Sequence, residues 1–77
     1  MKVYGYELKT EKFVTLKEAS IACSMEELDK IIEFLQHVSE SHKKAIGKTD
    51  FCHSHYQDWD SEWNQENTDL IVVSEFK

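Results

Sequence analysis

The chain has 77 residues, which is the length of one domain spanning residues 1–77. A chain this short buries only about 60–65% of its unfolded surface, so a deep active-site cleft is not expected. Nine lysines and no arginine stand against 15 carboxylates, for a formal net charge of -6. This balance disfavours a nucleic-acid ligand, because phosphate contacts require Lys and Arg, and it suits a basic protein partner.

The N-terminal stretch "MKVYGYELKTEK" lacks the apolar run of a signal peptide, and no stretch approaches membrane-spanning length. Cys23 and Cys52 do not make a disulfide framework, and both are expected to act as small buried hydrophobes with reduced thiols. The simplest interpretation is a cytoplasmic protein without a membrane partner.

Residues 2–8 alternate in the manner of a strand, with Tyr and Leu on one side, and residues 9–12 form a polar turn. Residues 13–23 resume strand character, but their apolar residues change phase partway along. The pattern therefore predicts a bulge or bend near Lys17 and Glu18.

A capping box, "SMEE", begins at Ser24, where the side chains of Ser24 and Glu27 can each bond to the other's backbone N–H. The basic residues of the last turn, His42, Lys43 and Lys44, suit the helix dipole, and Gly47 is the natural C-cap. One helix is predicted from about Met25 to Ala45. Its apolar stripe at helical spacing comprises Leu28, Ile31, Ile32, Leu35 and Val38, with Phe34 beside it.

The final strand, residues 69–76, is apolar on both faces, so one face must lie on an open sheet face, beneath a loop or in an interface. The segment after Gly47 begins like a short strand and ends as an acidic loop. The order strand, strand, helix, short strand, strand predicts an α+β two-layer sandwich. A small, mostly antiparallel sheet would carry one long helix on one face.

The segment "DFCHSHYQDWDSEW", residues 50–63, concentrates histidines, acids and aromatic residues. On a strand, His53 and His55 would point the same way, as two ligands of one metal ion do. Cys52 would point the opposite way, and no CxxC or HExxH spacing completes a ligand set, so no metal or other cofactor is predicted. The same geometry separates Cys52 from His53 as nucleophile and base, and no enzymatic activity is predicted.

Partner binding fits the second half of this segment better. Tyr and Trp are enriched at interface hot spots, and aromatic anchors among carboxylates suit a basic partner. If this part is helical, Trp59 and Trp63 share one face. The alternative is that the tryptophans cap the open end of the small core. The candidate contact residues are Tyr56, Asp58, Trp59, Asp60, Glu62 and Trp63.

Several stretches together resemble the immunity protein 32 family of bacterial polymorphic toxin systems. The resemblance runs through nearly the whole chain, from "KVYGYEL" to a terminal "DLIVVS". Its most specific parts are the strand-to-helix junction "IACSMEELDKIIEFL" and a D-F-x-H-x-H-aromatic-x-D motif. The motif residues are Asp50, Phe51, His53, His55, Tyr56 and Asp58.

The resemblance implies a bacterial cytoplasmic protein that is encoded beside a toxin and inhibits it by binding. Many such toxins are basic nucleases, which an acidic inhibitor would complement. Two alternatives remain open from the residues themselves. One is a small metal-binding domain that uses His53 and His55. The other is a homo-oligomeric domain, such as a homodimer, suggested by the two-sided apolar strand at residues 70–73.

Overall fold

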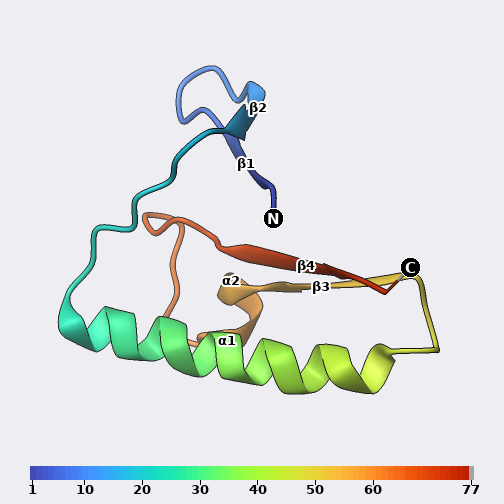
Figure 1. Ribbon diagram of the computed structural model, residues 1–77. Coiled ribbons are helices and arrows are strands. Elements are labelled where there is room, and N and C mark those ends of the chain that lie inside the picture. The colour runs from blue at the N-terminus through green and yellow to red at the C-terminus, as the bar shows by residue number, and fades with distance from the viewer. Residues whose placement is uncertain (77) are drawn as a thin grey trace.

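The computed structural model describes residues 1–76 (Figure 1). A long helix lies along one face of a two-stranded sheet, and a second hairpin stands on the opposite side of that sheet. The elements in chain order are β1 (Val3–Tyr6), β2 (Phe13–Leu16), α1 (Met25–Ala45), β3 (Phe51–His55), α2 (Tyr56–Trp59) and β4 (Ile71–Glu75). The α+β class, the antiparallel pairing and the long helix are confirmed. Within the described residues, the strands are divided between two hairpins, β1–β2 and β3–β4.

Helix α1 begins and ends where the sequence predicts. The Ser24 hydroxyl accepts a hydrogen bond from the Glu27 N–H at 3.1 Å, and the Glu27 carboxylate accepts one from the Ser24 N–H at 2.9 Å. The helix ends at the C-cap Ile46, one residue before the predicted cap, and Gly47 follows with φ +83°, a conformation that glycine adopts without penalty. Neither helix of residues 1–76 is long and apolar enough to cross a membrane.

The β1–β2 hairpin is held by an aromatic cluster. Tyr6 pairs with Phe13 across the hairpin, and the Phe13 ring lies 5.3 Å from the Tyr4 ring and 5.1 Å from the Tyr6 ring. Strand β2 ends at Leu16, and the chain bends at Lys17, as predicted. The strand does not resume after the bend, because no strand of the described part of the chain pairs with residues 18–24.

The core is smaller than the chain length predicts. Of residues 1–76, only Phe34, Val38 and His42 are buried, and they lie four residues apart on one face of α1. The chain exposes 6952 Å², against about 13,200 Å² for an unfolded chain of this mass, so roughly half of its surface is buried instead of the expected 60–65%. The deficit arises because the hairpin stands apart and only one face of β3–β4 is covered by a helix.

His42 joins α1 to both strands of the second hairpin. Its Nδ1 lies 2.6 Å from the Ser74 hydroxyl on β4, and its Nε2 lies 2.9 Å from the Ser54 hydroxyl on β3. The sequence suggested that His42 serves the helix dipole at the C-terminal end of α1. Its position in the last turn is confirmed, but the ring is 3% exposed and forms part of the core.

Candidate functional site

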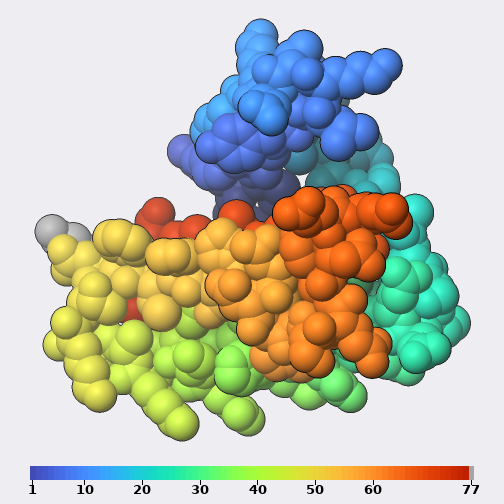
Figure 2. All heavy atoms as spheres, turned by 180° about the vertical axis from the view of Figure 1, so that it is seen from behind, coloured from blue at the N-terminus to red at the C-terminus, as the bar shows by residue number. Residues whose placement is uncertain are grey.

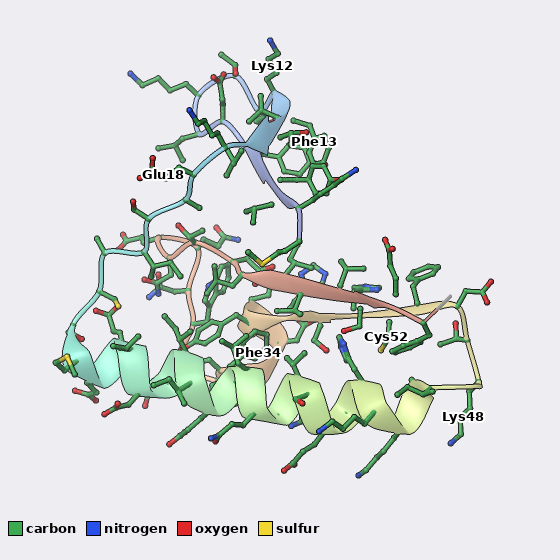
Figure 3. All side chains as sticks on the ribbon, in the orientation of Figure 1. Lys12, Phe13, Glu18, Phe34, Lys48 and Cys52 are labelled. Carbon is green, nitrogen blue, oxygen red and sulfur yellow. The ribbon has the colours of Figure 1, made fainter. Side chains whose placement is uncertain are left out.

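The alternation of β3 decides which of its side chains are accessible. Ser54 faces α1, since its hydroxyl contacts His42, and Cys52 shares that face by the two-residue period of a strand (Figure 3). His53 and His55 therefore face away from α1. Their ring centroids are 5.5 Å apart with an edge-to-face geometry. The predicted separation of Cys52 from the two histidines is confirmed. The expectation that both cysteines are buried is wrong, because Cys23 is exposed and Cys52 is only partly buried.

Asp69 fixes the end of β3 and the start of α2. One of its carboxylate oxygens lies 2.6 Å from Nδ1 of His55, and the other accepts a hydrogen bond from the Gln57 N–H at 2.9 Å. A metal ion could reach the His55 ring only through Nε2. Within residues 1–76, no group of three or more His, Cys, Asp or Glu side chains is placed to hold a metal ion.

Two aromatic residues of the predicted contact set pack against the core. Phe34 points from α1 toward the opposite layer (Figure 3), where the Tyr56 ring meets it edge-on at 5.2 Å and the Trp59 ring lies at 5.7 Å. Both rings are partly buried, and their own centroids are 5.7 Å apart. The interpretation of Trp59 as a cap on the open end of the core is therefore the one that the packing favours.

Trp63 does not share a helical face with Trp59, because α2 ends at Trp59 and Asp60 is extended. The Asp60 carboxylate stops the helix by accepting a hydrogen bond from the Glu62 N–H at 3.0 Å, a local turn typical of aspartate. The Trp63 indole N–H donates to the Thr68 carbonyl at 3.3 Å. Trp63 thus closes the loop that leads to β4.

The carboxylates of the segment differ in their partners. Lys30 on α1 lies 2.9 Å from the Glu62 carboxylate and 4.0 Å from that of Asp60, and the Glu62 hydrogen bond raises the pKa of Lys30. The Tyr56 hydroxyl donates to Asp60 at 2.9 Å, and burial raises the pKa of Tyr56. Two carboxylates share one lysine, so this cluster keeps a net negative charge, and Asp58 is exposed.

We expect Asp60 to contribute to the loss of stability of the protein as the pH falls into the acid range. The hydrogen bond from the Glu62 N–H lowers the pKa of Asp60 below its ordinary value of 3.8. A carboxyl group with a lowered folded pKa stabilises the fold above its unfolded pKa, and that contribution is lost as pH falls through the folded pKa. Asp60→Asn should therefore flatten the loss of stability on acidification, as measured by urea unfolding from neutral pH down to about pH 3. Glu40→Gln, at an exposed site on α1, serves as the control; an unaltered slope in Asp60→Asn would contradict the prediction.

A shallow depression of about 380 Å³ lies where β3, α1 and α2 meet. It joins residues that the sequence places far apart, because His37 comes from α1 and Trp59 from α2. Asp58 supplies a carboxylate to the same rim. The residues around it are His37, His53, Ser54, His55, Asp58 and Trp59.

The structure brings together part of the predicted set and adds residues to it. His53, His55, Asp58 and Trp59 border the depression. Asp50 and Phe51 lie at the opposite end of β3, where the Asp50 carbonyl accepts a hydrogen bond from the Phe76 N–H and Phe51 is exposed. Three residues of this region were not predicted from the sequence, because the residues that they lie beside are distant along the chain. They are Lys30, His37 and Asp69.

Comparison with protein-family models, with curated proteins and with solved structures found no match for this chain.

Proposed function

We propose that this protein is a bacterial immunity protein, which acts in the cytoplasm by binding a basic toxin and blocking it. The proposal rests on the resemblance of its sequence to the immunity protein 32 family and on an acidic surface built around α2. Binding, not catalysis, is the proposed activity. The toxin is proposed to be encoded beside this protein and to carry a basic, nuclease-like surface.

The observation that supports the proposal best is the position of Asp58. This exposed carboxylate borders the depression beside the partly buried Trp59 ring. A Lys or Arg side chain entering the depression would meet a carboxylate and an aromatic ring together, and both attract a cation. Because Phe34 holds the Trp59 ring in place, little conformational freedom would be lost on binding.

Co-expression with the neighbouring toxin tests the proposal. The wild-type protein should protect cells, and Asp58→Lys should weaken binding to the toxin by more than about tenfold, because like charges across an interface cost several kcal/mol. Glu40→Lys, on an exposed part of α1, makes the same charge change outside the surface and should protect like the wild type.

Trp59→Ala is unsuitable for this test, since loss of its packing on Phe34 would destabilise the fold. Full protection by Asp58→Lys would place the interface elsewhere on the molecule. Failure of the wild-type protein to protect cells that make the toxin would contradict the function itself.

A further inference from the structure

Within residues 1–76, two faces that expose apolar side chains have no covering layer. The first is the aromatic side of the β1–β2 hairpin, formed by Tyr4, Tyr6 and Phe13. The second is the outer face of β3–β4, the one turned away from α1. Its exposed apolar residues are Phe51, Ile71 and Val73, and the same face also carries His53, His55 and Glu75.

The exposed area exceeds what a single compact chain of this mass presents. A folded monomer of 9.1 kDa exposes about 4,900 Å², whereas this chain exposes 6952 Å². Its radius of gyration is 13.7 Å, against about 11.5 Å for a compact chain of 77 residues. The excess of about 2,000 Å² is more than twice the roughly 800 Å² that each partner buries in a stable interface.

The separation of the hairpin accounts for this excess. Figure 2 shows β1–β2 as a lobe that stands off the rest of the molecule. An irregular linker, residues 17–24, connects it to α1. In Figure 3, Phe13 lies on the opposite side of the hairpin from Glu18 in this linker, so the linker does not cover the aromatic face.

The two faces are similar in length, and each carries exposed apolar side chains. The hairpin strands have four residues each and β3 and β4 have five, so the faces are about 13 and 17 Å long. Two small sheets of this kind can pack face to face at about 10 Å, with apolar side chains between them. β4 carries Ile71 and Val73 on its outer face as well as Val72 on its inner face, so a second layer would bury apolar side chains that α1 does not cover.

We propose that the protein is a homodimer in which the β1–β2 hairpin of each copy covers the outer face of β3–β4 of the other. Two-fold symmetry repeats the hairpin-to-sheet contact, so the excess exposed area of both chains is buried in the dimer. The arrangement completes a helix–sheet–sheet stack around each β3–β4. The dimer is inferred from exposed area and not from the proposed inhibition of a toxin, although the covered face carries His53 and His55, which also border the depression.

Sedimentation analysis of the full chain, over a wide range of concentration, tests the dimer. The wild type should sediment at twice the 9.1 kDa chain mass. Phe13→Ser on the hairpin and Val73→Ser on the sheet should each weaken the dimer by at least about tenfold, as central apolar contacts do. Leu8→Ser, in the exposed turn between β1 and β2, removes a similar apolar side chain and should leave the dimer unchanged.

NMR spectra of a mixture of isotope-labelled and unlabelled chains distinguish a hairpin that packs on the sheet of another copy from one that packs on the sheet of its own chain. Intermolecular nuclear Overhauser contacts between the hairpin rings and the methyl groups of Ile71 and Val73 are the expected result. A monomer at every concentration would overturn the proposal. So would a dimer that neither serine variant weakens, or ring-to-methyl contacts found only within one chain.

Discussion

Phe34→Ala should destabilise the protein by about 3–5 kcal/mol, the usual cost of truncating a buried phenylalanine. Phe34 is 1% exposed, and the rings of both Tyr56 and Trp59 pack against it. Its loss would open a cavity between α1 and α2 in a core with few other members. Since small domains have total stabilities of only about 5–15 kcal/mol, this loss should remove a large share of the free energy of unfolding.

Urea unfolding followed by tryptophan fluorescence measures this effect, because Trp59 reports directly on the Phe34 contact. Leu35→Ala is the matched control, since Leu35 is the next residue of α1 and is 47% exposed. It should lose clearly less stability than Phe34→Ala. Equal losses in the two variants would show that Phe34 is not the centre of the core.

His42→Leu should cost about 1–3 kcal/mol, because it leaves the Ser54 and Ser74 hydroxyls without the ring nitrogens that they contact. Leucine keeps most of the apolar volume, so the loss comes mainly from unmet hydrogen bonds. α1 should also be held less firmly against β3 and β4, since His42 contacts both strands. The free energy of unfolding and hydrogen exchange in β3 and β4 measure the two effects.

The triple variant His42→Leu, Ser54→Ala, Ser74→Ala tests the cause. Replacing all members of a buried polar group by apolar side chains is close to neutral, whereas removing one member leaves the others unsatisfied. The triple variant should therefore be more stable than His42→Leu alone. Additive losses would contradict a hydrogen-bonded origin of the stability.

The helix was predictable because its signals are local. The Ser24 cap, the apolar spacing behind it and Gly47 lie within or beside α1, and each acts over only a few residues. The polar link from His42 to β3 and β4 was not predictable, because Ser54 and Ser74 lie 12 and 32 residues away. No periodic pattern encodes such a contact.

The candidate site was predictable only in part. Strand alternation correctly placed His53 and His55 on one face and Cys52 on the other. The helical pairing of Trp59 with Trp63 was wrong, because the Asp60 turn ends α2. The division of the aromatic residues between core and surface depends on Phe34, which comes from a distant part of the chain.

The central proposal, that this protein inhibits a toxin through its acidic surface, is tested most directly by calorimetric titration against the toxin proposed to be encoded beside it. Saturable binding is expected, weakened by more than about tenfold in Asp58→Lys and unchanged in Glu40→Lys. The binding should also weaken as the salt concentration rises, because charged groups at the rim of the interface contribute to the affinity. Absence of binding by the folded wild-type protein would contradict the claim.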